Sequence, residues 1–148
     1  MSYQYASEVR EVATKLISLY HYDLANVRIA YVWRDKPIIR GGKTVLGKAR
    51  KISGLPAFLA SEDLDTDNPA FFVIEIDKTY WPSLSENERE ALVDHELTHC
   101  IVDEDEGTLK ILPHDLEEFY VIVKRHGLWS EGVQTMAATI DSNRVNAE

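Results

Sequence analysis

The chain has 148 residues and a formal net charge of −9, and 45% of its residues are hydrophobic. This length and composition are typical of one soluble globular domain with its own core. The negative charge argues against a general affinity for nucleic acid, and no apolar run reaches the about 18 residues that cross a membrane. The single cysteine cannot form an intramolecular disulfide, and Met1–Arg10 lacks the apolar segment of a secretion signal. We therefore expect a soluble, cytoplasmic protein.

The first half of the chain predicts one helix followed by strands. Apolar residues recur at helical spacing over residues 6–20, which is typical of an amphipathic helix with one buried stripe. Residues 27–33 are rich in β-branched and aromatic side chains and predict a strand. Glycines and a proline then indicate a hairpin-like excursion, with a short second strand within residues 44–52. Residues 53–69 predict a loop, in which the acidic run Glu62–Asp67 is expected to be solvated surface and not a calcium site.

The strongest strand signal lies just before the main predicted helix. Residues 71–76 are almost continuously apolar, which favours a central position in the sheet. Ser85 and Glu88 then match a capping box, in which each side chain bonds an unpaired backbone N–H group of the first helical turn. The helix that begins there should reach about Val102.

The C-terminal part predicts a second helix and little order after it. Asp115 and Glu118 make another candidate capping box, for a helix that runs to about His126 and ends at Gly127. The signals then fade, and we expect residues 130–148 to be a weakly structured tail. Together the elements predict a single α+β domain over residues 1–148. It would have an N-terminal helix and three or so strands in a mixed or antiparallel sheet.

The helix that begins at Ser85 contains an H-E-x-x-H motif at His95, Glu96 and His99. On a helix, residues one and four apart project within about 100° of each other, so both imidazoles and the carboxylate converge. Neutral imidazoles are zinc ligands, and a nearby carboxylate can take a proton from the water that the zinc activates. The motif predicts a zinc hydrolase with one Zn²⁺ per chain, in which His95 and His99 are ligands and Glu96 is the general base.

A catalytic zinc usually takes three protein ligands, so a third donor is needed. His114 is preferred, because a helix–loop–helix return of 15 residues from His99 can bring it over the first helix. The start of the second helix also favours a neutral imidazole there. Glu118, with Glu117 beside it, is the alternative, since two histidines and a glutamate form another established catalytic set. Three other donors are less suitable by position: His21, His126 and Cys100, the last expected to be a buried, inert thiol.

The strings H-E-L-T-H, P-H-D-L-E-E-F and H-G-L-W resemble the putative phage metallopeptidase family, and the likeness extends over most of the chain to Trp129. The spacing of the histidines is also similar to that of SprT-like zinc proteases. The resemblance implies a small zincin-like domain, with His95, His99 and His114 as zinc ligands and Glu96 as general base. The third ligand would lie on the helix that follows the motif. If the chain is phage-encoded, the resemblance implies the host cytoplasm as its location.

Two departures qualify this resemblance. No zinc ribbon or other targeting module follows the core, which puts DNA-linked substrates in doubt. Thermolysin-like enzymes share the string H-E-L-T-H but take a later glutamate as third ligand, which keeps the glutamate alternative open.

The sequence thus predicts a metallopeptidase that hydrolyses a peptide bond of a protein or peptide substrate, bound extended along an exposed sheet edge. One alternative is a non-catalytic acidic phage interaction protein that uses zinc structurally, although structural zinc normally takes four protein ligands. Another is a non-peptidase zinc hydrolase, because the motif does not specify the bond that is attacked.

Other functional assignments remain open. Residues 34–51 carry seven basic residues against the single acid Asp35, so this strip is either a solvated face or a docking site for an acidic partner. Within the strip, Arg50 and Lys51 could reach the active site. No residue is assigned to stabilise the oxyanion: Tyr80 and Tyr120 are nearest in sequence, but Tyr120 should lie on the packed face of its helix.

Overall fold

The structure is a computed structural model that describes residues 1–61 and 69–147, so the acidic run Glu62–Asp67 and any calcium binding by it lie outside the described residues. The chain divides into two compact units, Met1–Leu112 and Pro113–Glu148.

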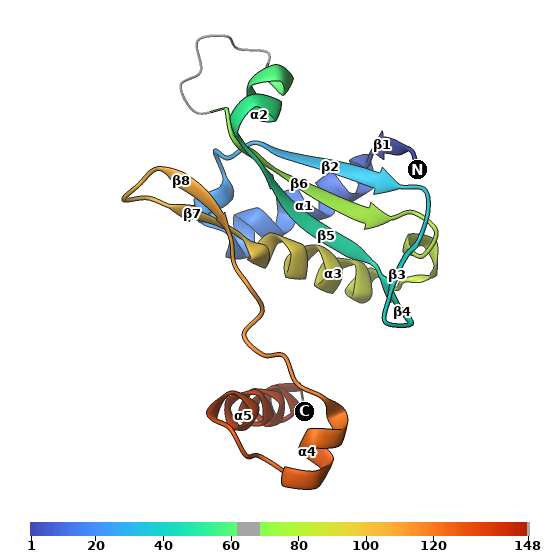
Figure 1. Cartoon of the computed structure of the whole chain (residues 1–148), viewed down its shortest axis with the longest axis vertical. Coiled ribbons are helices and arrows are strands. Elements are labelled where there is room, and N and C mark those ends of the chain that lie inside the picture. The colour runs from blue at the N-terminus through green and yellow to red at the C-terminus, as the bar shows by residue number, and fades with distance from the viewer. Residues whose placement is uncertain (62–68, 148) are drawn as a thin grey trace. The chain divides into compact units, whose positions relative to one another are not determined.

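The first unit is built on a four-stranded mixed sheet (Figure 1). Its strands, in spatial order, are β1 (Tyr3–Tyr5), β2 (Ile29–Arg34), β6 (Phe71–Asp77) and β5 (Gly47–Ile52). Strands β2 and β6 are parallel, whereas β1 and β5 pair antiparallel with their neighbours. Strand β6 has a partner on each side and is buried over most of its length, as its continuous apolar sequence predicts. The expected α+β class is confirmed, and the sheet, expected to be mixed or antiparallel with three or so strands, is mixed and has four.

Helices α1 (Ser7–Tyr20) and α3 (Glu86–His99) pack against each other and against the sheet. The buried stripe of α1 follows the helical spacing seen in the sequence. The core is formed by side chains of both helices and the central strands, among them Val9, Ala13, Leu16, Phe72, Ile74, Ile76, Val93 and Leu97. Short 3₁₀ turns, η1 (Tyr22–Leu24) and η2 (Trp81–Ser83), lead out of α1 and towards α3.

Alternate residues of β6 carry buried charges. Asp77 pairs in register with Arg34 of β2, and both side chains are fully buried, with Arg34 Nη2 3.8 Å from Asp77 Oδ2. The Arg34 guanidinium also donates to the carbonyls of Lys36 (3.0 Å) and Val45 (2.5 Å). These contacts tie down the hairpin of β3 (Ile38–Arg40) and β4 (Lys43–Val45), which leads directly into β5.

Two arginines of the basic strip at residues 34–51 make contacts within the fold. Arg34 is inaccessible, and Arg50 forms an ion pair with the buried carboxylate of Glu75. Both residues therefore stabilise the fold of the chain itself. A partner-binding role for the rest of the strip stays a prediction.

Three elements of the first unit differ from the sequence-based expectations. Residues expected to form a loop include α2 (Gly54–Ala60), whose Pro56 lies in the first turn, where no intrahelical N–H bond is lost. Strand β1 has only three residues, all exposed, and so gives no sequence signal. Helix α3 ends at His99 and not at Val102, because the chain continues as a hairpin of β7 (Cys100–Asp103) and β8 (Thr108–Ile111).

The second unit contains α4 (Tyr120–His126) and α5 (Glu131–Ala147). The predicted start of a helix at Asp115 is wrong: the capping box does not form, and the carboxylate of Glu118 instead accepts from the N–H of Phe119 (2.9 Å). Gly127 ends α4 with a φ of 64°, as predicted. Helix α5 has 17 residues and occupies the segment expected to be a weakly structured tail. Over the described residues, none of the helices has the length and apolar character that crossing a membrane requires.

Candidate metal centre

The start of α3 is fixed by the capping box that the sequence predicts. The Ser85 hydroxyl accepts from the N–H of Glu88 (3.1 Å), and the Glu88 carboxylate accepts from the N–H of Ser85 (3.0 Å). Both bonds satisfy backbone donors that the first helical turn leaves unpaired. The H-E-x-x-H motif then occupies the last turns of this helix, before the chain changes to an extended conformation at Cys100.

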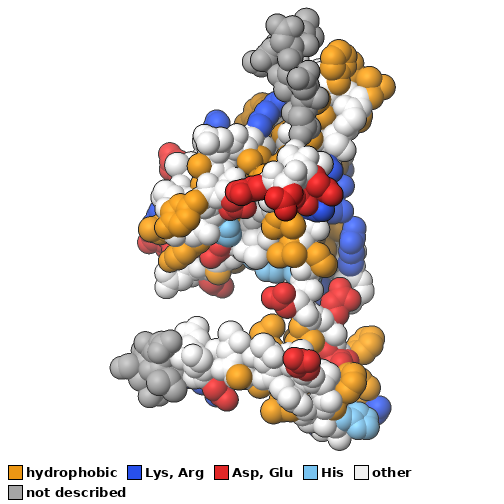
Figure 2. All heavy atoms as spheres, turned by 90° about the vertical axis from the view of Figure 1, so that its left-hand side faces the viewer, with side chains coloured by type: hydrophobic (Ala, Val, Ile, Leu, Met, Phe, Trp, Pro, Cys, Tyr) orange, Lys and Arg blue, Asp and Glu red, His pale blue; other side chains and the backbone are white. Residues whose placement is uncertain are grey.

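The β7–β8 hairpin brings the chain back to the end of α3. Cys100 lies opposite Ile111 in the ladder, and the next residue, Leu112, donates its N–H to the carbonyl of His99 (2.7 Å). In the turn, the Asp103 carboxylate accepts from two backbone N–H groups, and Gly107 has a φ of 65°. Acidic side chains gather at the tip of this hairpin, which faces the viewer in Figure 2. The expected helix–loop–helix return is therefore a β-hairpin.

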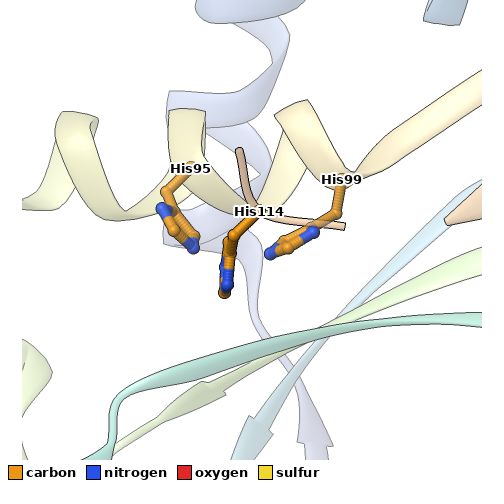
Figure 3. Close-up of side chains that lie close together, drawn as sticks. All are labelled: His95, His99 and His114. Carbon is orange, nitrogen blue, oxygen red and sulfur yellow. The ribbon is translucent and has the colours of Figure 1, made fainter. Parts of the chain in front are cut away.

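His114 follows Leu112 by two residues, on the segment that leaves the hairpin. An extended chain advances about 3.3 Å per residue, so this segment can carry His114 back along α3. One ring nitrogen from each of His95, His99 and His114 lies within 4.8 Å of the other two (Figure 3). The rings of His95 and His99 are 5.1 Å apart at an angle of 78°. The structure thus brings together the three histidines that the sequence singles out.

Leu112 also orients the ring of His99. Its carbonyl oxygen lies 2.6 Å from Nδ1 of His99, and because a carbonyl can only accept, Nδ1 must donate. The other ring nitrogen, Nε2, is then the one with a lone pair to offer. Histidines that bind metals commonly hold their second nitrogen in this way, which fixes both the tautomer and the ring orientation.

Glu96 follows His95 in α3 and is buried, with 3% of its surface exposed. Its Oε1 is 4.0 Å from Nε2 of His99. Burial raises the pKa of the Glu96 carboxyl to about 7, and the nearby charge of His99 acts in the opposite direction. A carboxyl group with a pKa close to neutrality can both accept and return a proton near pH 7.

Gly47, at the start of β5, provides the space that Glu96 occupies. A Cβ atom at this position would lie 3.1 Å from Oε2 of Glu96 and 3.1 Å from Cδ1 of Ile76. Any larger residue would therefore push against the carboxylate or against the core. In the sequence Gly47 is only one of several glycines that punctuate a hairpin. Its position at a strand, where glycine often marks a close approach, was the available signal.

The rival donors lie elsewhere. Neither Glu117 nor Glu118 belongs to the histidine cluster. Nε2 of His21 lies 2.7 Å from the carboxylate of Asp94. The Cys100 thiol is buried, its Sγ is 3.6 Å from the carbonyl of Glu96, and burial raises its pKa to about 12. The expected burial of the thiol is confirmed, and its inertness stays a prediction.

The structure also shows where the two tyrosines and two basic residues considered for the active site lie. Tyr120 is 88% exposed, so the prediction that it lies on the packed face of its helix is wrong. The Tyr80 hydroxyl accepts from that of Thr44 (3.4 Å). Because side chains alternate along a strand, Lys51 shares the side of β5 on which Gly47 meets Glu96, whereas Arg50 points to the other side. Of the two basic candidates, only Lys51 lies on the side of Glu96.

The donor set can be tested against the metals that proteins bind. Three imidazoles suit zinc and its neighbouring transition metals, whereas calcium and magnesium require oxygen ligands. Three protein ligands also leave a further coordination position open, which distinguishes catalytic from structural zinc sites. The residues present therefore fit a catalytic transition-metal ion.

A comparison with family models gives a match to the family described as putative phage metallopeptidase, over residues 1–141. The matched region includes the histidine cluster and Glu96. Searches among curated proteins and among solved structures give no match.

Proposed function

Because the chain belongs to the putative phage metallopeptidase family, we propose that it is a zinc-dependent peptidase whose active site is the histidine cluster. The observation that carries this proposal is the convergence of His95, His99 and His114 beside the buried carboxylate of Glu96. The three histidines would hold one zinc ion per chain. A bound zinc supplies Lewis acidity, which polarises the scissile carbonyl and makes water a better nucleophile near neutral pH.

Glu96 is the general base in this proposal. Its carboxylate takes the proton from the attacking water and passes it to the nitrogen of the leaving amine. Burial raises the pKa of Glu96 in the metal-free chain, and the charge of a bound zinc would favour the carboxylate form that a base requires. Burial between α3 and Gly47 holds the carboxylate in one place and excludes competing water.

The substrate would lie extended beside β5, the edge strand of the sheet on the side of the histidine cluster. An edge strand offers unpaired backbone groups to a peptide, which can bind as an additional strand. Gly47 at one end of β5 is in contact with Glu96, so a peptide along this edge would pass close to the proposed base.

The ligand assignment is tested by the zinc content of the purified protein, measured by elemental analysis. We expect about one zinc per chain in the wild type and in Glu118→Ala, and a large loss in His114→Ala. Zinc lost with Glu118→Ala and kept with His114→Ala would show a site of two histidines and a glutamate. Wild-type protein that takes up no zinc even after reconstitution would refute the proposal.

The catalytic assignment is tested by Glu96→Gln, with unfolded casein as a general substrate. We expect this variant to retain zinc and to lose activity by about 10²-fold or more, the usual contribution of a general base. If zinc-loaded wild type cleaves no peptide bond and Glu96→Gln keeps the biological function, zinc has a structural role. Hydrolysis of a different bond that depends on Glu96 would indicate a non-peptidase hydrolase.

A further inference from the structure

The sheet has a second open edge, on the side away from β5. Strand β1 covers only one half of β2, pairing with Val32–Arg34, and a last bond joins the N–H of Ala6 to the carbonyl of Tyr31 (2.9 Å). The chain then leaves the sheet to begin α1 at Ser7. Among the described residues, no strand therefore lies beside the other half of β2, around Ile29, on this side (Figure 1).

The backbone groups of Ile29 point to this open edge. Phe72 of β6 donates to the carbonyl of Arg28 (3.2 Å), so the backbone N–H and C=O groups of Arg28 point to β6. The backbone groups of Ile29 and Tyr31, which alternate with Arg28 along the strand, point the opposite way. Tyr31 confirms this direction, because its carbonyl accepts from Ala6. No described residue forms a backbone hydrogen bond with Ile29 from this side.

Two cavities lie along the open edge, with volumes of about 470 Å³ and about 250 Å³. They share Arg10 of α1, Arg28, Ile29 and Tyr31, and so form parts of one depression, which we call the α1–β2 groove. The larger cavity follows α1, where Arg10, Thr14, Ile17 and Ser18 recur at helical spacing. The groove thus lies between a helix and the unpaired half of a strand, a geometry that can admit an extended chain.

The charge of the groove is opposite to that of the whole molecule. The chain carries 25 acidic residues against 16 basic ones, yet among the described residues that line the two cavities none is acidic. Arg10 and Arg28 are both exposed, and neither forms an ion pair with a described residue. Arg28 is held in place by Phe71, whose ring lies 4.3 Å from its guanidinium carbon, and by the carbonyl of Ala60 (3.3 Å).

We propose that the α1–β2 groove binds an extended, acidic segment of a partner protein, which adds to the sheet as a strand beside Ile29. The backbone of Ile29 would supply the strand pairing, and Arg10 and Arg28 would pair with carboxylates of the segment. Tyr31, Ile17 and Val27 provide the apolar walls on which alternate side chains of the segment would rest. This site goes beyond the proposed peptidase function: it uses none of the metal-centre residues and lies at the opposite edge of the sheet from β5.

The test uses the full chain with Glu96→Gln, so that a probe is not cleaved and binding is measured apart from catalysis. The probe is a fluorescein-labelled peptide of about six residues, the usual strand length, in which valine alternates with glutamate. We expect it to bind with a change in fluorescence anisotropy and to shift the amide NMR signal of Ile29. Arg10→Gln and Arg28→Gln should each weaken binding about tenfold, the effect of one charge-assisted hydrogen bond. Arg40→Gln, an exposed arginine on β3 outside the groove, is the matched control and should leave binding unchanged.

Two further probes separate the contributions. A peptide in which valine alternates with lysine should bind at least about tenfold more weakly, and N-methylation of the backbone of the acidic peptide should abolish strand pairing. The proposal is overturned if the lysine peptide binds as well as the glutamate peptide, or if no binding occurs at millimolar peptide. Equal effects of Arg10→Gln and Arg40→Gln would also overturn it. If free glutamate competes as strongly as the peptide, the groove is an anion site and not a strand-addition site.

Discussion

The position of the Glu96 carboxylate depends on the absence of a side chain at Gly47. In Gly47→Ala the new Cβ atom would lie 3.1 Å from both Oε2 of Glu96 and Cδ1 of Ile76, so one of these side chains must move. We expect a loss of about 1–3 kcal/mol in stability from overpacking. Peptidase activity should fall by about tenfold or more because the base is displaced, while zinc content is unchanged. Thermal melts, zinc analysis and casein cleavage measure the three effects.

Gly42→Ala is the matched control for this substitution. Gly42 has a φ of 76° and no atom within 4 Å of an added Cβ, so alanine there costs stability through backbone strain alone. Activity per folded molecule should be unaltered in this variant. If Gly47→Ala resembles Gly42→Ala in keeping full activity, Gly47 does not position Glu96.

Burial of the Cys100 thiol has its own consequence. The side chain is 3% exposed and its pKa is raised to about 12, so almost no thiolate is present or accessible at pH 8. We expect iodoacetamide to modify Cys100 only as fast as the protein unfolds, and rapidly in guanidinium chloride. Mass spectrometry of timed samples measures this rate. Rapid modification under native conditions would show that the end of α3 opens locally.

Single residues explain why the candidate site was only partly predictable. His95, Glu96 and His99 are close in sequence, so helical geometry alone places them together. Gly47 and Leu112 act on the site through contacts with residues 49 and 13 positions away, respectively. Neither residue has a side chain that suggests chemistry. The supporting contacts of the site therefore required the three-dimensional structure.

Among the elements, α3 owes its start to the Ser85 cap. Removing the hydroxyl in Ser85→Ala leaves the N–H of Glu88 without its partner, and we expect a loss of about 1 kcal/mol in stability with zinc content unchanged. Ser53→Ala is the matched control, because Ser53 occupies the N-cap of α2 but its side chain makes no capping hydrogen bond. Equal melting temperatures for the two variants would show that the Ser85 cap contributes nothing.

The hairpin that follows α3 shows where prediction of elements from sequence fails. Cys100 and Ile101 continue the apolar spacing of the helix, so a local pattern extends α3 to Val102. In the structure these residues pair with Leu109–Ile111, an interaction that no local pattern contains. The Ser85 cap was predictable because its partners are three residues apart. The β7–β8 pairing was not, because its energy comes from residues on the other side of a turn.

At the scale of the whole molecule, the main cluster of buried apolar side chains lies within Met1–Leu112, and Val133 is a buried apolar residue of the second unit. We therefore expect a chain that ends after Leu116 to fold and to bind zinc, because it keeps the core and all three histidines. A chain that ends after Leu112 should also fold but should bind zinc weakly, since His114 is absent. Circular dichroism melts and elemental analysis measure the two properties. Failure of the longer chain to fold would show that residues after Leu116 are needed for stability.

The class of the molecule was predictable and its topology was not. Amphipathic and apolar patterns identify α1, β2, β6 and α3 in the sequence, and these elements suffice for the α+β assignment. The order β1-β2-β6-β5, with one parallel pair, depends on contacts between strands as far apart as residues 29 and 72. The same limitation hid the open edge of β2, which exists only because β1 is short.

The hairpin also bears on how relatives of this protein are recognised. The interval of 15 positions from His99 to His114 is set by the length of the β7–β8 ladder and its turn. The chain crosses that ladder twice, so each additional rung would lengthen the interval by two residues and still return the third histidine to the same place. A search with a fixed interval would miss such proteins. A search for a helix that carries the motif, followed by a hairpin of any length and then a histidine two or three residues after its last rung, would find them.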